Sequence, residues 1–181
     1  MQDLLNGLLP RLYPDLAFQF LVYEGKSDLE KNIPRKLRAG WPPGVRFVVL
    51  RDNDGADCIQ LKQRLLQSCQ TAGRGDTLVR LVCQELEAWY LGEPDALAEA
   101  FGNERLRRIK RKARFRDPDT VQQPSKAIKR LVPEFQKGNG ARMMANLLSR
   151  ERNRSKSFQA LLSGLDRLYA ECRVSASDST I

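Results

Sequence analysis

Two short apolar segments separated by a helix-like segment constrain the fold of this chain more than any other feature. Residues 45–51 (VRFVVLR) and 77–83 (TLVRLVC) are rich in β-branched residues and have the length of buried strands. Between them, residues 57–72 place apolar side chains at helical spacing. Because parallel strands need a crossover, usually a helix, this alternation predicts an α/β fold with a mainly parallel sheet flanked by helices.

The segments before these strands extend the same pattern. An amphipathic helix is predicted over residues 3–13, and residues 17–23 (AFQFLVY) predict a further strand. Ser27 or Asp28 can then cap a helix that reaches about Ala39. We therefore expect three strands before the chain becomes helical.

Charge is divided unevenly along the chain. Residues 1–100 contain 12 Lys and Arg against 14 Asp and Glu, whereas residues 101–181 contain 19 against 8. Strand signals also stop after Phe101. We expect an α/β core at residues 1–101 and a basic helical C-terminal extension at residues 102–181, which packs on the core and contacts a polyanion such as nucleic acid.

Histidine is absent from the sequence, and its absence excludes several classes of enzyme. Neither a Ser-His-Asp triad nor a His-ligated zinc site can form. The four scattered cysteines contain no C-x-x-C pair, which argues against a zinc cage or a disulfide framework. A bound metal would be oxygen-ligated, so Mg²⁺ or Mn²⁺ is expected.

No apolar run approaches the ~20 residues that a membrane-spanning helix needs. The sequence also lacks a charged segment followed by the apolar segment of a secretion signal. We expect a cytoplasmic protein without a membrane partner.

Asp52 and Asp54 follow the predicted strand at residues 45–51. In open α/β sheets, ligands bind at the carboxyl ends of the strands. Residues two apart in an extended chain point the same way, so both carboxylates can converge on one or two hard cations. The alternative is an acidic turn in which Asn53 and Gly55 serve conformation alone.

Two other families use similar acidic loops. An EF-hand loop beginning at Asp52 would need Gly at position 57 and Glu at position 63, where the chain has Asp57 and Gln63. The run from Asp52 to Gly55 is similar to the nucleophile loop of haloacid-dehalogenase phosphatases. That family is the rival enzymatic interpretation.

Glu85 and Glu87 follow the predicted strand at residues 77–83 and should reach the same sheet edge. One of them can complete a cluster of oxygen ligands while the other caps a helix or forms a salt bridge. Basic side chains farther along the chain are donors suited to phosphate: Lys126, Arg152, Arg154 and Lys156.

Residues 105–116 (RLRRIKRKARFR) contain eight Lys or Arg and no acid. Such a run is typical of a solvated helix face, and it also suits contact with phosphates. We expect the nucleic-acid contacts here to be Arg107, Arg108, Lys110, Arg111 and Lys112.

Several motifs together resemble a known family. These are GKSDLEKNIPRKLRAG, VVLRDNDGADC, LKQRL, ELEAWYLGEPDAL, PSKAIKRL and RNRSKSFQ. They resemble a bacterial Toprim-related family of unknown function, often encoded beside AAA-type ATPases, over about residues 4–165. Toprim domains, including those of overcoming-lysogenization-defect nucleases, bind Mg²⁺ through a Glu after the first strand and a D-x-D after a later strand.

The resemblance implies a Toprim-like sheet and roles for individual residues. Asp52 and Asp54 match the D-x-D, Glu85 or Glu87 matches the third acidic position, and Lys126 matches a basic residue that contacts phosphate. The catalytic set expected from these matches is Asp52, Asp54, Glu85, Glu87 and Lys126. The expected metal ligands are Asp52, Asp54, Glu87 and, as a substitute, Glu24.

One departure from the family concerns the first strand, whose Glu would lie before Met1. We expect an open position in the sheet, a metal cluster that lacks one carboxylate, no tightly bound metal, and weak or absent activity. The leading hypothesis is a Mg²⁺-dependent nuclease subunit of a defence or mobile-element system that acts with an AAA-type ATPase. The alternative is a non-catalytic nucleic-acid-binding or regulatory partner.

Overall fold

A two-stranded parallel sheet forms the centre of the fold. The computed structural model describes residues 1–178, with side chains described for residues 1–173. Strands β1 (Val48–Asp52) and β2 (Leu78–Val82) pair in parallel, and α3 (Cys58–Thr71) is the crossover between them. The predicted α/β class and these two strands are confirmed.

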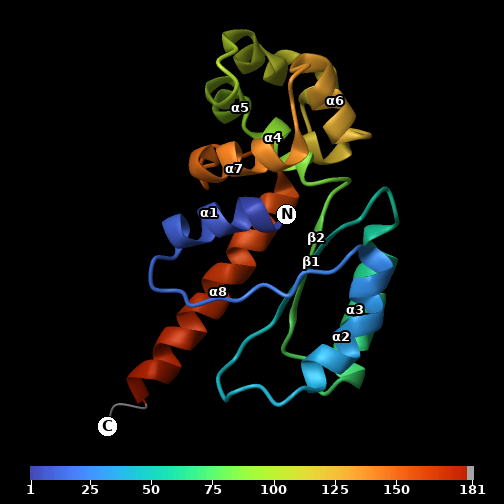
Figure 1. The fold of residues 1–181 in the computed structure, drawn as a ribbon, viewed down its shortest axis with the longest axis vertical. Helices are drawn as coiled ribbons and strands as arrows, with labels where there is room; N and C mark the ends of the chain where they lie inside the picture. Colours follow the sequence, from blue (N-terminus) through green and yellow to red (C-terminus); the bar gives the residue numbers. More distant parts are fainter. Residues whose placement is uncertain (179–181) are drawn as a thin grey trace.

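Helices cover both faces of this sheet (Figure 1). Val49 and Val79 point toward α3 and α2 (Lys26–Arg38), whereas Leu78 and Val82 point toward α8 (Lys156–Asp178). This alternation follows from the two-residue period of a strand. Each strand therefore has apolar side chains on both faces, as is usual for parallel strands, although Val48 at the start of β1 is exposed.

Helix α8 makes a close contact with β2. A Cβ on Gly164 would lie 2.8 Å from a methyl carbon of Leu78, so a side chain at this position would force the two elements apart. The Arg80 Nε–H group donates a hydrogen bond of 2.8 Å to the carbonyl of Ala160. Helix α8 thus completes the core on one face of the sheet.

Helix α1 (Gln2–Leu12) packs against α7 (Lys137–Leu147). The contact is close because a Cβ on Gly7 would lie 2.8 Å from the Cβ of Ala145. Just after α1, the Tyr13 hydroxyl hydrogen bonds to the Asp166 carboxylate at 2.7 Å, which ties this end of the helix to α8.

Short helices form a layer beyond the carboxyl ends of the strands (Figure 1). Buried Trp89 stands edge-on to Phe158 of α8 and donates a hydrogen bond from its indole N–H to Ser157. A single hydrophobic cluster thus joins residues from both halves of the chain. The elements of this layer are α4 (Glu87–Gly92), α5 (Pro94–Ala100), α6 (Pro124–Leu131) and the 3₁₀ segments Glu104–Arg111, Ala113–Phe115 and Pro118–Thr120.

The strand predicted at residues 17–23 is wrong, because this segment belongs to no strand of the described structure. Its side chains are used: Phe18 and Phe20 stand edge-to-face at 5.3 Å, and Phe20 packs on the main core. Within the described chain, its backbone makes no hydrogen bond to β1 or β2. Packing of the apolar side chains fixes the position of the segment, but a strand also needs a neighbouring strand that pairs with its backbone N–H and C=O groups.

Candidate functional site

A buried carboxylate lies where β1 ends. The Oδ1 atom of Asp52 is inaccessible to solvent and has no hydrogen-bond partner among the described residues. A small cavity of about 150 Å³ opens beside it, bordered also by Asp3, Glu87 and Lys137. Buried polar atoms are normally paired, so an orphaned carboxylate oxygen marks a position that needs explanation.

The electrostatic environment of this cavity favours protonated acids. The pKa of Asp52 is raised from 3.8 to about 7, chiefly by burial and also by the negative charges of Glu87 and Asp54. Burial also raises the pKa of Glu87, while the nearby Lys137 ammonium lowers it. Perturbed carboxylates that face one another in a cleft are typical of functional sites.

Lys137 is the basic residue that reaches these acids. Its ammonium lies 3.8 Å from Glu87 Oε1 and 4.0 Å from Glu85 Oε2, and its side chain is well exposed. The Tyr90 hydroxyl is buried without a partner in the described structure, and burial raises its pKa well above 10. Sequence reasoning missed Lys137 and Asp3, because only packing of α1 and α7 over the strand ends brings them to the cavity.

Glu85 and Glu87 lie in different surroundings. Glu85 accepts a hydrogen bond of 2.9 Å from the N–H of Ser125 and so caps the first turn of α6. Glu87 stays at the cavity beside Asp52. Lys126 follows Ser125 and is exposed, outside the residues that border the cavity.

Asp54 does not point the same way as Asp52, contrary to the expectation from an extended chain. The strand ends at Asp52, and Asp54 has a left-handed backbone with φ of 49°. Its carboxylate instead lies 3.2 Å from the Lys26 ammonium at the start of α2. Buried Asn53 holds this turn, since its side chain accepts from the N–H of Gln84 and donates to the carbonyl of Ala56.

Glu24 lies on the surface before α2, where its backbone N–H donates to the Asp28 carboxylate. Within residues 1–173, whose side chains are described, no group of three or more His, Cys, Asp or Glu side chains is close enough to hold a metal ion. The four expected metal ligands are therefore not assembled. The structure brings Asp52 and Glu87 to one cavity.

The sequence of this chain matches a family profile over residues 3–166, which is most of its length. The chain belongs to the DUF4276 family. This family is described as a domain of unknown function. No curated protein and no solved structure matches the chain. No described helix of this DUF4276 domain is both long and apolar enough to cross a membrane.

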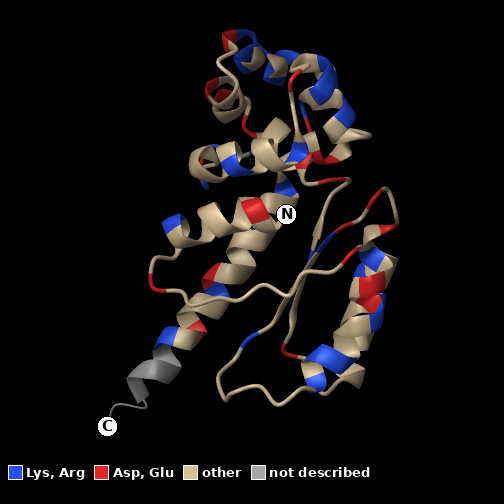
Figure 2. Ribbon diagram, in the orientation of Figure 1, with Lys and Arg blue, Asp and Glu red and all other residues tan. Residues whose placement is uncertain are grey.

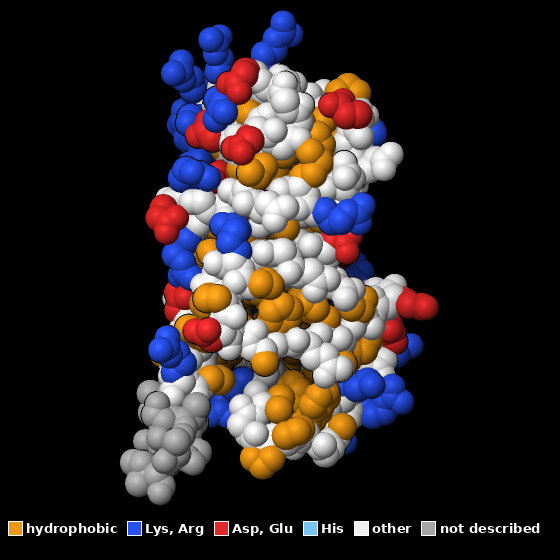
Figure 3. Space-filling model, turned by 60° about the vertical axis from the view of Figure 1, so that its left-hand side comes forward, with side chains coloured by type: hydrophobic (Ala, Val, Ile, Leu, Met, Phe, Trp, Pro, Cys, Tyr) orange, Lys and Arg blue, Asp and Glu red, His pale blue; other side chains and the backbone are white. Residues whose placement is uncertain are grey.

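The basic run forms an exposed surface on the outer layer of the DUF4276 domain (Figures 2 and 3). Arg107 and Lys110 both pair with Asp95, at 3.5 and 3.1 Å, and so are partly neutralised. The other three predicted contacts are exposed cations for which no salt bridge is found in the described structure: Arg108, Arg111 and Lys112.

Three other predicted nucleic-acid contacts already have partners within the protein. Arg152 pairs with buried Glu93 at 2.7 Å, and Lys156 pairs with Asp117 at 3.1 Å. Arg154 donates hydrogen bonds to backbone carbonyls at the end of the basic run. These contacts attach the start of α8 to the helical layer, so phosphate would have to compete with partners already in place.

Proposed function

We propose that this DUF4276 domain is a Toprim-like, Mg²⁺-dependent domain that processes phosphodiesters, as a nuclease subunit working with an AAA-type ATPase. The observation that carries the proposal is the orphaned carboxylate oxygen of Asp52 at the carboxyl end of β1. Ligand sites of open α/β sheets lie at this edge. The motifs that resemble those of Toprim-related proteins include the same residue.

The residues at the cavity fit an oxygen-ligated cation. Asp52 has an unpartnered oxygen, and Glu87 borders the same cavity. Two carboxylates and water are a usual ligand set for Mg²⁺ in proteins. A bound Mg²⁺ would supply positive charge that stabilises negative charge on phosphate oxygens.

The other residues of the site have roles that follow from their positions. Because its pKa is raised to about 7, Asp52 must release a proton near neutral pH before it can bind the cation, so Mg²⁺ binding should strengthen as pH rises. Exposed Lys137 places an ammonium at the cavity, where it can pair with a phosphate oxygen. The exposed cations of the basic run can hold the rest of the strand through its phosphates.

The experiment is a cleavage assay on single-stranded and double-stranded nucleic acid with Mg²⁺ or Mn²⁺. Asp52→Asn combined with Glu87→Gln should abolish cleavage and weaken Mg²⁺ binding measured by calorimetry. Lys62→Gln is a matched control for Lys137→Gln, because Lys62 is an exposed lysine on α3 outside the cavity. Metal-dependent cleavage that survives the double substitution would overturn the proposal.

A second candidate is a non-catalytic nucleic-acid-binding or regulatory partner. It is favoured by the exposed cations Arg108, Arg111 and Lys112, together with a cavity that is bordered by two of the four expected metal ligands, Asp52 and Glu87. It predicts nucleic-acid binding that persists in a metal chelator, without cleavage. The phosphatase alternative would need Asp52 and Asp54 to act on one phosphate, whereas Asp54 faces Lys26.

A further inference from the structure

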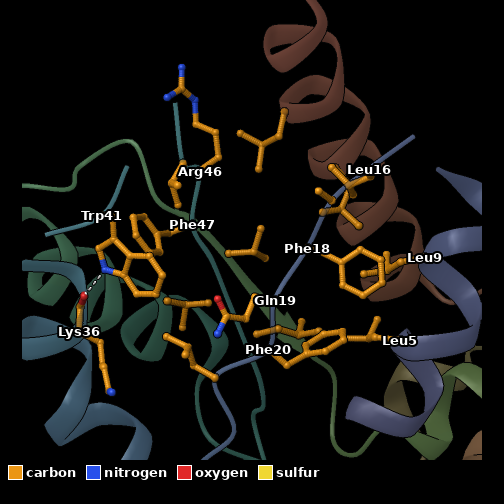
Figure 4. A pocket seen from close by; sticks show the side chains of 18 of the residues that line it. Leu5, Leu9, Leu16, Phe18, Gln19, Phe20, Lys36, Trp41, Arg46 and Phe47 are labelled. Atoms are coloured by element: carbon orange, nitrogen blue, oxygen red, sulfur yellow. Dashed lines mark hydrogen bonds between the residues drawn. The ribbon is translucent and has the colours of Figure 1, made fainter. Parts of the chain in front are cut away.

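A large apolar cavity lies between β1 and the extended segment at residues 16–23. Its volume is about 1170 Å³, which exceeds the ≈ 300–1,000 Å³ of pockets for drug-sized ligands. Figure 4 shows Trp41 and Phe47 on one side and Phe20 and Leu5 on the other. We call this space the β1 slot.

The backbone of β1 presents unpaired groups to the β1 slot. The N–H of Leu78 donates to the carbonyl of Phe47 at 2.9 Å, so odd-numbered residues of this strand bond to β2. The intervening residues Val48 and Leu50 must direct their N–H and C=O groups the opposite way. Within the described chain, residues 16–23 make no backbone hydrogen bond to them. Backbone groups of this kind are normally paired when buried.

Both faces of the β1 slot are apolar. Leu9 and Leu165 line it from α1 and α8, and Ile33 and Leu37 line it from α2. A strand covered on both faces is a nearly continuous apolar run. The slot thus has the lining that a buried central strand requires.

Exposed apolar side chains gather on the two segments that border the slot. Apart from Ile59 on α3, the large apolar side chains that are exposed in the described structure all belong to these segments: Phe18, Leu21, Val22 and Val48. Figure 3 shows apolar side chains gathered beside α8 in the middle and lower parts of the molecule. Contiguous exposed apolar surface marks an interaction site.

We propose that the β1 slot is a docking site for an extended, uncharged segment of a partner polypeptide, which pairs with β1 and adds a strand to the sheet. A lipid chain could fill the apolar volume, but it has no donors and acceptors for Val48 and Leu50. A segment that matches the five residues of β1 would be about 16 Å long at ≈ 3.3 Å per residue. Backbone pairing supplies affinity in this mode of recognition, and the side chains supply fit.

The test uses the full chain and a displayed library of random linear peptides. Selected peptides should contain an uncharged run rich in β-branched and aromatic residues. A synthetic copy of a selected peptide should slow hydrogen–deuterium exchange at the amides of Val48 and Leu50, measured by NMR. Val49 should change little, because β2 already pairs with it.

Two lysine substitutions provide a matched comparison. Val48→Lys, at a side chain 40% exposed, should weaken peptide binding by about tenfold or more, because it places a charge at the slot. Ile59→Lys, at a side chain 70% exposed on α3, should change the affinity for the peptide by less than about twofold. If Val48→Lys does not fold, Leu21→Lys takes its place.

Four results would overturn the proposal. Selection could yield no uncharged run, or peptide binding could leave exchange at Val48 and Leu50 unchanged. A fatty acid could compete with the peptide and bind without slowing exchange at these amides, which would make the slot a lipid site. Concentration-dependent dimers that protect the same amides would make a second copy the occupant. None of these readouts depends on Asp52 or Glu87, so they are separate from tests of the nuclease proposal.

Discussion

Replacing Asp52 with Asn should make the protein more stable, and the gain should grow with pH. The pKa of Asp52 is raised from 3.8 to about 7, so the folded state holds a proton that the unfolded state releases. Between these values the folded state binds more protons, and stability falls as pH rises. Asn removes this penalty because it cannot ionise.

The shift from 3.8 to about 7 corresponds to a penalty of about 4 kcal/mol once Asp52 is fully ionised. This is a large part of the ≈ 5–15 kcal/mol by which a typical domain is stable. We expect wild type and Asp52→Asn to be nearly equal at pH 4, and the variant to be more stable by about 2–4 kcal/mol at pH 8. Urea unfolding between pH 4 and pH 8 measures the free energies of unfolding of wild type and of the variant.

Asp54→Asn is the matched control, because Asp54 is exposed and faces Lys26. It should change stability by less than about 1 kcal/mol, as for most surface ion pairs. Added Mg²⁺ should stabilise wild type but not Asp52→Asn, because binding to the folded state alone raises stability. An Asp52→Asn protein less stable than wild type at pH 8, or a gap that does not grow with pH, would refute the reasoning.

Three further predictions concern packing and charge. Gly92→Ala should lower the free energy of unfolding by about 2 kcal/mol or more, because a Cβ would lie 2.3 Å from Asn153 Oδ1; thermal unfolding measures it. Arg152→Ala should cost about 1–3 kcal/mol in urea unfolding, because Glu93 is buried and loses its cation; an unchanged midpoint would contradict this. A variant in which three exposed cations are replaced by Gln should bind nucleic acid with a weaker dependence on salt. The slope of log binding constant against log salt concentration should fall in magnitude by about two to three. The three residues are Arg108, Arg111 and Lys112.

Local patterns predicted two of the three expected strands correctly, because β1 and β2 are short apolar runs beside a helical crossover. They also predicted that one of Glu85 and Glu87 would cap a helix, and Glu85 does so at the start of α6. The two-residue period of a strand could not predict where the Asp54 side chain points, because the backbone of Asp54 is in the left-handed conformation. Lys137 could not be found either, because it reaches the site only through the packing of distant helices.

The contact between α8 and β2 has a consequence for synthesis on the ribosome. Ala160, which accepts the hydrogen bond from Arg80, is made 80 residues later. At ≈ 5–20 residues per second, this interval lasts about 4–16 s. During that time the Leu78 face of β2 lacks its covering helix, so the nascent chain displays apolar surface that aggregates readily. Chaperones that hold nascent chains should therefore associate with this protein until α8 has emerged.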